Sequence, residues 1–201
     1  MNRVLVPQKG FITKSDRQGL NGHRSAILWF TGLPSSGKST LACHLEERLF
    51  RRGVRTFVLD GDNIRAGLNK DLVFSAVDRE ENIRRIGEVA KLFVDAGIMV
   101  MTAFISPYRK DRAFVRNLVE RDEFIEIYVK CPLGICEQRD VKGLYRMAKQ
   151  GLIQRFTGFD DPYEEPDHPE YLVQSDRITV EESIEGIISY LEEKGLFMSG
   201  D

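Results

Sequence analysis

One short run carries the clearest chemistry in this sequence of 201 residues: Gly32-Leu33-Pro34-Ser35-Ser36-Gly37-Lys38-Ser39, followed by Thr40. Its spacing, G-x-x-x-x-G-K-[ST], is typical of a loop whose glycines let successive backbone N–H groups point at a polyphosphate. The Lys38 ammonium then reaches the β- and γ-phosphates, and the Ser39 hydroxyl coordinates Mg²⁺. We call residues 32–39 the phosphate loop and expect it, with Thr40, to bind a nucleoside triphosphate.

The segments on either side of the phosphate loop have the pattern that such a site needs. Residues 26–31 are apolar and indicate a buried strand, while Leu41, Leu45 and Leu49 recur every four residues, as on one face of a helix. The N-terminus of this helix would face the phosphates with its partial positive charge. A chance match in a Gly/Ser-rich turn is the alternative, and this context disfavours it.

Two carboxylates, Asp60 and Asp62, stand where the second expected strand ends. Ligands of open α/β sheets gather beyond the carboxyl ends of the strands, so both aspartates are candidates for binding metal and activating an attacking hydroxyl. We expect Asp60 to share Mg²⁺ with Ser39, and the sequence leaves open which aspartate is the base. An Asx-type turn with Gly61 at positive φ is the alternative role, and it can coexist with catalysis.

A group of basic and amide side chains near the expected long helix suggests an anionic acceptor: Arg65, Arg79, Asn82, Arg84 and Arg85. Guanidinium groups bind phosphate-like and sulfate-like oxygens bidentately, at about 1.5–3 kcal/mol for each charge-assisted hydrogen bond. Arg84 and Arg85 can instead form ion pairs with glutamates four residues earlier. Arg79 has no acidic partner at helical spacing downstream, which favours a ligand role for Arg79.

Two phenylalanines, Phe74 and Phe156, lie in polar, loop-like parts of the sequence. An exposed aromatic ring there could stack on a nucleotide base, which is worth about 1–3 kcal/mol. Packing in the core is the alternative for each ring, because aromatic side chains are commonly buried for their area alone.

The bulk properties are those of one globular domain. The chain is 42% hydrophobic and 30% charged, and its net charge of −2 gives no basic field for nucleic acid. Its three cysteines lack C-x-x-C spacing, which argues against a disulfide framework and a zinc site. Neither a signal peptide nor an apolar run long enough for a membrane is evident, so we expect a cytoplasmic protein.

Apolar, strand-like runs alternate with amphipathic, helix-like segments along the chain. This alternation predicts an α/β fold with a mainly parallel five-stranded sheet flanked by helices. The strands are expected at 26–31, 54–59, 98–105, 124–130 and 171–174, and the clearest helices at 77–96, ending near Gly97, and at 180–193.

Two segments stand apart from this alternation. Residues 1–24 are polar and weakly periodic, and we interpret them as an arm of uncertain order. Residues 142–169 are rich in glycine, proline and charge, with one short helical segment around 144–149. We call residues 142–169 the lid, because this composition is typical of a segment that moves over a bound nucleotide.

Several motifs occur together in one order: Gly32 to Ser39, Asp60-Gly61-Asp62-Asn63, Phe74-Ser75, Asp78-Arg79-Glu80-Glu81-Asn82, Ile105-Ser106-Pro107-Tyr108-Arg109, Lys142-Gly143-Leu144-Tyr145 and Phe156-Thr157-Gly158. With this set the chain resembles adenylylsulfate kinases over about residues 20–195. The resemblance implies a three-layer P-loop NTPase fold with a kinase domain over residues 25–201. It also implies transfer of the γ-phosphoryl group of ATP to the ribose 3′-hydroxyl of adenosine 5′-phosphosulfate, a step of sulfate assimilation.

The resemblance also implies roles for individual residues. Arg65, Arg79 and Asn82 would hold the phosphosulfate, and Phe74 and Phe156 would enclose the adenine of the acceptor. Further contacts would come from Ile105, Ser106 and Leu144. Lys142 would approach the transferring phosphate from the lid, and Arg139 would stack on the adenine of ATP.

Ser106 is a special case, because the serine of I-S-P-Y-R is often described as a phosphoserine intermediate in this family. A phosphate-loop kinase can transfer in line without covalent help, and no base is evident to activate the Ser106 hydroxyl. We therefore favour direct transfer, with Ser106 binding the acceptor.

Two other functions are compatible with a phosphate loop: a kinase for another small hydroxylated acceptor, and a regulatory subunit that binds ATP without turnover. The aromatic and arginine residues favour a nucleotide acceptor, and the complete set of Lys38, Ser39 and both aspartates favours catalysis. We expect no nucleic-acid or membrane partner. A homodimer and a functional link to an ATP sulfurylase are further expectations.

Overall fold

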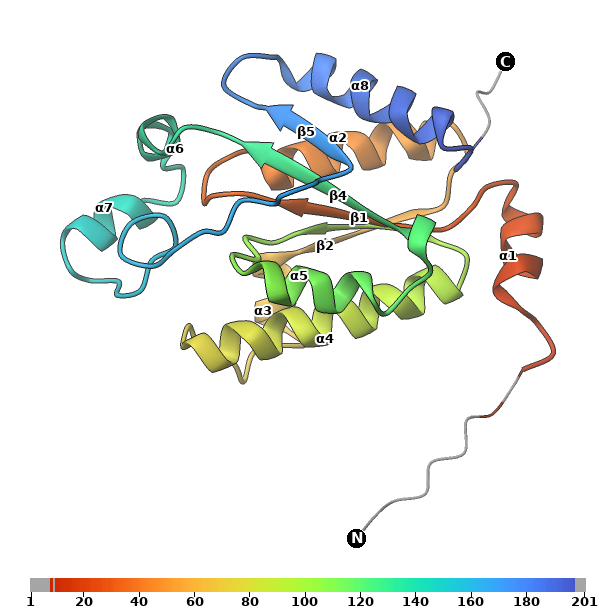
Figure 1. Ribbon diagram of the computed structural model, residues 1–201, viewed down its shortest axis with the longest axis horizontal. Helices are drawn as coiled ribbons and strands as arrows, with labels where there is room; N and C mark the ends of the chain where they lie inside the picture. Colours follow the sequence, from red (N-terminus) through yellow and green to blue (C-terminus); the bar gives the residue numbers. More distant parts are fainter. Residues whose placement is uncertain (1–7, 9, 198–201) are drawn as a thin grey trace, which may run out of the picture.

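The computed structural model describes residue 8 and residues 10–197. Residues 1–7 and 9, which belong to the expected arm, and residues 198–201 lie outside the described residues. Five strands form one parallel sheet in the order β2-β3-β1-β4-β5 (Figure 1). They are β1 (Ile27–Thr31), β2 (Thr56–Asp60), β3 (Met99–Ala103), β4 (Phe124–Lys130) and β5 (Tyr171–Gln174). The α/β fold with a five-stranded parallel sheet is thereby confirmed.

The core explains why the strands are continuous apolar runs. Both faces of the sheet are covered: α2 (Lys38–Arg51) and α8 (Val180–Glu193) lie on one face, and α4 (Ala76–Asp95) and α5 (Arg109–Arg116) on the other (Figure 1). Alternate residues of β1 feed the two cores, with Leu28 and Phe30 against α2 and with Ile27 and Trp29 against α4. A strand buried on both faces has no polar alternation, so its sequence reads as uniformly apolar.

The register brings the carboxyl ends of the strands to one edge. Phe30 of β1 is paired with Ala103 of β3, which is paired in turn with Asp60 of β2. The segments that follow these three strands therefore begin at the same level of the sheet. This edge also holds α3 (Gly61–Ala66), α6 (Leu133–Arg139) and α7 (Leu144–Lys149), toward which the arrows of β1 and β4 point (Figure 1).

Part of the expected arm is a docked helix, α1 (Lys14–Asn21), at the opposite end of the sheet (Figure 1). A capping box between Thr13 and Asp16 begins it, and the Asn21 side-chain amide donates to the carbonyl of Gly97 at 2.8 Å. Gly97 has φ 81°, and a Cβ there would lie 2.8 Å from the Cβ of Arg17. A glycine thus both ends α4 and allows α1 to approach closely.

The lid contains its own small core. Its helix α7 spans the residues expected to be helical. Outside the lid, a 3₁₀ turn (Arg121–Glu123) precedes β4. Tyr145 and Phe156 of the lid pack with Cys131 and Cys136.

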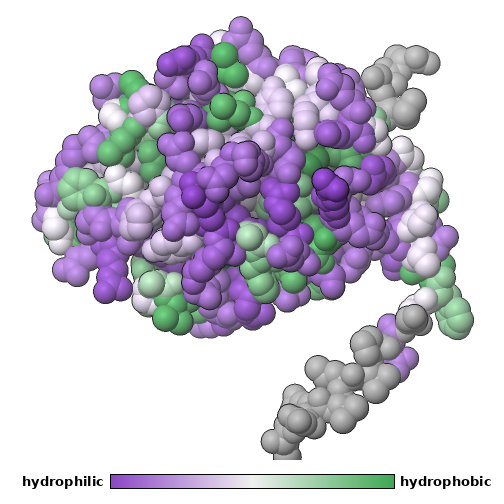
Figure 2. Space-filling model, in the orientation of Figure 1, coloured by the Kyte–Doolittle hydropathy of each residue, from purple (hydrophilic) through white to green (hydrophobic). Residues whose placement is uncertain are grey.

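The surface in the view of Figure 2 is mostly hydrophilic, with separate small apolar areas. Within the described part of the chain, no helix combines the length and apolar character that a membrane span requires.

Candidate active site

The phosphate loop joins β1 to α2 with a strained backbone. Ser35 has φ 60° and Gly37 has φ 103°, and a Cβ at Gly32 would lie 2.5 Å from the carbonyl oxygen of Val129. No side chain caps the N-terminus of α2, where Gly37 is the cap residue. The first N–H groups of this helix are therefore left for a ligand, and the helix dipole makes that ligand an anion.

Lys38 is buried and folded back over its own loop. Its ammonium donates to the carbonyls of Gly32 at 3.0 Å and Leu33 at 2.7 Å, with the Ser36 hydroxyl at 3.4 Å. Burial lowers the pKa of Lys38 to about 8. Its described hydrogen-bond partners are all uncharged, so an anionic phosphate in their place would stabilise the charged form of Lys38.

Ser39 and Asp60 meet at the start of α2 and the end of β2. The Ser39 hydroxyl donates to Asp60 Oδ2 at 2.7 Å, while Asp60 Oδ1 accepts from the N–H of Asp62 at 3.0 Å and caps α3. The Asx-type role considered for Asp60 is therefore present as a helix cap, with Gly61 as the first residue of α3 and not at positive φ. These hard oxygen donors fit Mg²⁺, and the described residues contain no cluster of three or more side chains that could hold a metal alone.

Asp62 and Lys142 form an ion pair that links the sheet edge to the first residue of the lid. Both side chains are exposed, so the pair contributes little to stability. Its importance is positional, because it places a carboxylate and an ammonium beside the metal-binding candidates Ser39 and Asp60.

Arg79 forms an ion pair with a residue far along the chain, which an analysis of helical spacing could not reveal. Its guanidinium pairs with Asp161 of the lid at 2.6 Å and donates to Thr157 at 3.1 Å. It also donates to the carbonyls of Phe74, at 3.1 Å, and Arg155. Helical spacing detects only neighbours within a turn, whereas Asp161 is brought in by the fold. Arg79 thus connects α4 to the lid.

The two phenylalanines have different surroundings. Phe74 is 63% exposed, with the guanidinium of Arg65 lying 4.4 Å from the centre of its ring. Phe156 is 7% exposed and packs edge-on against Tyr145 at 4.9 Å. For Phe156 the core alternative describes the structure, because Tyr145 and the α6 residues cover it. Phe74 keeps a face that a base could stack on.

The remaining candidates for the acceptor site have different surroundings. Asn82 is buried, and its side-chain oxygen accepts from Asn69 at 2.9 Å. Ile105 is partly exposed after β3, and Leu144 packs on the lid core. Arg85 pairs with Glu81, four residues earlier, as the ion-pair alternative expected, and also with Asp71. Arg84 pairs with Glu81 as well, three residues earlier, rather than with Glu80, which pairs with Lys110. These hydrogen bonds from Arg84 and Arg85 lower the pKa of Glu81 to about 2.

Ser106 is 2% exposed and has φ 41°. Its hydroxyl accepts from Trp29 Nε1 at 3.0 Å and donates to Thr31 Oγ1 at 2.9 Å. The Thr31 hydroxyl donates in turn to the carbonyl of Ile105 at 2.8 Å. The hydroxyls of Ser106 and Thr31 thus both donate to oxygen atoms within this series of hydrogen bonds. The described partners of Ser106 include no carboxylate or imidazole that could deprotonate it.

Arg139 connects the phosphate loop to the end of β5. Its guanidinium donates to the carbonyl of Ser175 at 2.6 Å and, at the longer distance of 3.5 Å, to that of Ser36. Ser175 also donates to the Ser36 carbonyl, at 2.8 Å. Arg139 therefore lies beside the donor site, while Thr40 is exposed on the first turn of α2.

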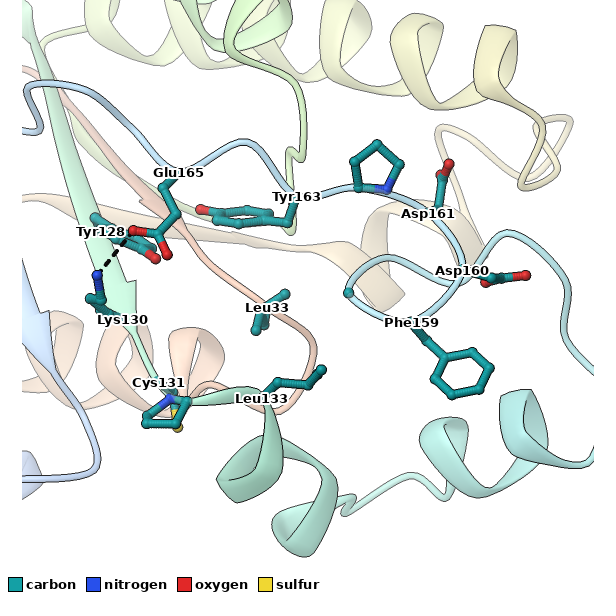
Figure 3. Close-up of a pocket in the computed structure, with 13 residues that line it drawn as sticks. Leu33, Tyr128, Lys130, Cys131, Leu133, Phe159, Asp160, Asp161, Tyr163 and Glu165 are labelled. Atoms are coloured by element: carbon teal, nitrogen blue, oxygen red, sulfur yellow. Dashed lines mark hydrogen bonds and ion pairs between the residues drawn. The ribbon is translucent and has the colours of Figure 1, made fainter.

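A cavity of about 700 Å³ lies between the phosphate loop and the lid (Figure 3). Leu33 forms one wall, and Phe159, Asp161 and Tyr163 of the lid form another (Figure 3). The sequence interpretation missed Asp161 and Tyr163. The signal for them was the run Asp160-Asp161-Pro162-Tyr163, whose polar and aromatic residues follow Phe156-Thr157-Gly158 directly.

A phosphate loop between β1 and α2, a carboxylate at the end of β2 and a lid on a parallel sheet define a P-loop kinase. Residues 24–174 match the sequence model of the adenylylsulphate kinase family. The chain therefore belongs to that family, and the resemblance inferred from the motifs is confirmed.

Individual relatives agree with this assignment. A probable adenylyl-sulfate kinase of Bacillus subtilis is 60% identical over 195 residues, which are 97% of this chain and 98% of the relative. An adenylyl-sulfate kinase of Oceanobacillus iheyensis is 60% identical over 190 residues, or 94% and 96% of the two chains. The APS kinase CysC of Mycobacterium tuberculosis, solved in complex with AMPPNP and APS, is 44% identical with a TM-score of 0.80. That comparison covers 85% of this chain and 99% of the other.

Proposed function

We propose that this protein is an adenylylsulfate kinase, which transfers the γ-phosphoryl group of ATP to the ribose 3′-hydroxyl of adenosine 5′-phosphosulfate. The products are ADP and 3′-phosphoadenosine 5′-phosphosulfate. The observation that carries the proposal is the meeting of the phosphate loop, Asp60, Asp62 and the Arg79 cluster at one edge of the sheet. The Mycobacterium tuberculosis relative, captured with an ATP analogue and APS, supports both substrates.

The donor side binds ATP through the phosphate loop. The N–H groups at the start of α2 and the ammonium of Lys38 hold the phosphates, and Lys38 exchanges the carbonyls of Gly32 and Leu33 for phosphate oxygens. Ser39 and Asp60 would hold Mg²⁺, which when bound neutralises charge on the β- and γ-phosphates. Arg139, beside Ser36, would lie against the adenine of ATP.

The acceptor side binds the phosphosulfate through Arg79, Arg65 and Asn82. Arg79 would release Asp161 and bind the anion instead, because a doubly anionic group competes well with one carboxylate for a guanidinium. Phe74 stacks on the adenine with its exposed face. Phe156, together with Ile105, Ser106 and Leu144, would complete the pocket when the lid closes.

We assign the general base to Asp62. Asp60 uses both of its oxygens, one on Ser39 and one on the N–H of Asp62, whereas the carboxylate of Asp62 contacts only the exposed ammonium of Lys142 among the described residues. Asp62 can thus take the proton of the ribose hydroxyl, and Lys142 can turn to the transferring phosphoryl group. Ser106 takes no covalent part in the transfer and, with its backbone, helps to bind the acceptor.

A turnover assay tests the function. The purified protein with Mg²⁺ and ATP should form ADP with adenosine phosphosulfate, and the acceptor should gain one phosphoryl group in a mass spectrum. A 3′-deoxy acceptor should bind without turnover, since the attacked hydroxyl is gone. Faster phosphorylation of sugar acids would establish the other kinase instead, and ATP binding without any acceptor turnover would establish a regulatory subunit.

Three cellular aspects belong to the same proposal. We expect the enzyme to act in the cytoplasm, as a homodimer, and downstream of an ATP sulfurylase that supplies its acceptor. Gel filtration with light scattering tests the dimer, and co-purification tests a physical link to the sulfurylase.

A further inference from the structure

The guanidinium of Arg112, on α5, is only 3% exposed, and it contacts Ser106, a residue of the proposed acceptor site. Its guanidinium bonds three separate segments: Glu126 of β4 at 2.6 Å, the carbonyl of Ser106 at 2.6 Å and the carbonyl of Glu164 at 2.7 Å. A buried guanidinium is costly unless its donors are satisfied, so this geometry is strongly specified. Glu126 supplies the counter-charge, and the two carbonyls define what Arg112 holds together.

The two carbonyls belong to segments that are also joined directly. We call residues 105–109 the acceptor loop and residues 163–165 the hinge segment of the lid. The N–H of Glu164 donates to the carbonyl of Pro107 at 2.8 Å, and the N–H of Arg109 donates to the Glu164 carboxylate at 2.7 Å. The Tyr163 hydroxyl lies 3.0 Å from that of Thr31. The hinge segment and the acceptor loop are thus fastened to each other directly, and further contacts of the acceptor loop with the lid run from Tyr108 to Asp161 and from Arg109 to Asp167.

The acceptor loop needs such an anchor because Ser106 is held at φ 41°. A non-glycine residue in this region costs about 1–3 kcal/mol and persists only where its surroundings over-determine it. The Ser106 hydroxyl is fixed by Trp29 and Thr31, and its carbonyl is fixed by Arg112. Without the Arg112 contact, the Ser106 carbonyl keeps only the longer hydrogen bond from the Thr31 hydroxyl, at 3.5 Å, among its described contacts.

We propose that Arg112 is a positioning residue that sets the acceptor loop and the hinge segment of the lid as one unit. It touches neither substrate and acts through Ser106 and Glu164. This inference rests on the proposed function, because it assigns residues 105–109 to the acceptor. Its consequence is selective: losing Arg112 impairs acceptor binding and lid closure, while ATP binding to the phosphate loop is preserved.

The test compares Arg112→Lys with the matched control Arg116→Lys. Lysine keeps a positive charge for Glu126 but cannot bridge two carbonyls. Among the described contacts, the hydrogen bonds of Arg116 go to Glu126 and Glu170, away from the acceptor loop and the hinge segment. The measurements are the KM for each substrate, kcat, the melting temperature, and the rate of protease cleavage within residues 142–162 with ADP and acceptor present.

We expect Arg112→Lys to raise the KM for adenosine phosphosulfate about ten- to hundredfold, as small misplacements of positioned groups do, with the KM for ATP within about twofold of the wild type. Its protection from protease should weaken, and Arg116→Lys should leave both properties unchanged. A wild-type acceptor KM in Arg112→Lys, or equal losses for both substrates in both variants, overturns the proposal. Absence of turnover in the wild type refutes the proposed function instead.

Hydrogen exchange of the wild-type protein provides a measurement that needs no variant. Adding ADP and adenosine phosphosulfate should slow exchange in peptides covering residues 105–109 and 163–165 together, because they share one anchor. Protection of one segment without the other contradicts the shared anchor. This result decides the proposal even if Arg112→Lys does not fold.

Discussion

The donor side and the acceptor side of the site are built in opposite ways. On the donor side, Lys38 and Ser39 bond groups within the short stretch from Gly32 to Asp60. On the acceptor side, Arg79 reaches Thr157 and Asp161, which the fold brings from the far end of the lid. The proposed donor site is therefore encoded mainly by a local motif, in which Lys38 exchanges carbonyls of its own loop for phosphate oxygens. In the proposed acceptor site Arg79 must instead give up contacts with a distant segment of the lid.

This difference gives a rule for the effect of substitutions. Substitutions on the donor side should lower kcat without altering the affinity for the acceptor, because the donor-side groups contact ATP alone. Changes on the acceptor side should alter one KM selectively and also loosen the lid.

The largest effect is expected for Lys38→Ala. Loss of the only buried ammonium in the phosphate loop should reduce kcat by about 10³-fold or more, the scale of removing a key electrostatic group. The fold should persist, because Lys38 bonds only carbonyls of its own loop and the hydroxyl of Ser36. Turnover and melting temperature are the measurements, with exposed Lys194→Ala as the control. Near-normal turnover in a folded variant refutes the donor site.

Asp62→Asn should come next, with kcat lowered about 10²- to 10³-fold if Asp62 accepts the ribose proton. The affinity for MgATP should change little, since Asp62 lies beyond the Ser39–Asp60 pair. Asp60→Asn is the matched comparison and should weaken MgATP binding instead. Single-turnover rates and nucleotide titrations separate the two effects, and exchanged outcomes would make Asp60 the base.

Arg79→Ala should raise the KM for adenosine phosphosulfate by about tenfold or more, the scale of one lost charge-assisted contact, and leave the KM for ATP nearly unchanged. The variant also frees Asp161, so protease should cleave the lid faster. Arg84→Ala is the control, because Arg84 pairs with Glu81 on the same helix. Parallel changes in both KM values would place Arg79 outside the acceptor site.

The pH dependence of ATP binding should report the state of Lys38, whose pKa burial lowers to about 8. Below pH 8 the free enzyme carries the charged ammonium that phosphate binds, and above it the neutral amine dominates. Affinity should therefore fall by about tenfold for each pH unit above 8, until the higher pKa of the complex is reached. Titrations with an ATP analogue from pH 7 to 10 measure this. A flat profile would mean that Lys38 stays charged throughout.

The same contrast explains how far the sequence could be interpreted. The strands and the phosphate loop were predictable, because a buried parallel strand is a continuous apolar run and the loop is a fixed spacing. The Arg79 to Asp161 pair and the burial of Phe156 against Tyr145 were not, because they depend on how the lid folds back. Helix α1 was missed although Thr13 and Asp16 carry a capping box, since the helix is too polar to show a periodic apolar face.

The smallest effect is expected for Ser106→Ala, and it decides between two mechanisms. The Ser106 hydroxyl is bonded to Trp29 and Thr31 and has no base among its described partners, so we expect direct transfer. Activity should then fall only by the loss of a hydrogen bond worth about 0.5–1.5 kcal/mol, or roughly two- to tenfold. The wild type incubated with ATP alone should show no added phosphoryl group by mass spectrometry. An inactive variant together with a phosphorylated wild-type Ser106 would establish a covalent intermediate, and the acceptor loop would then hold the nucleophile rather than only the acceptor.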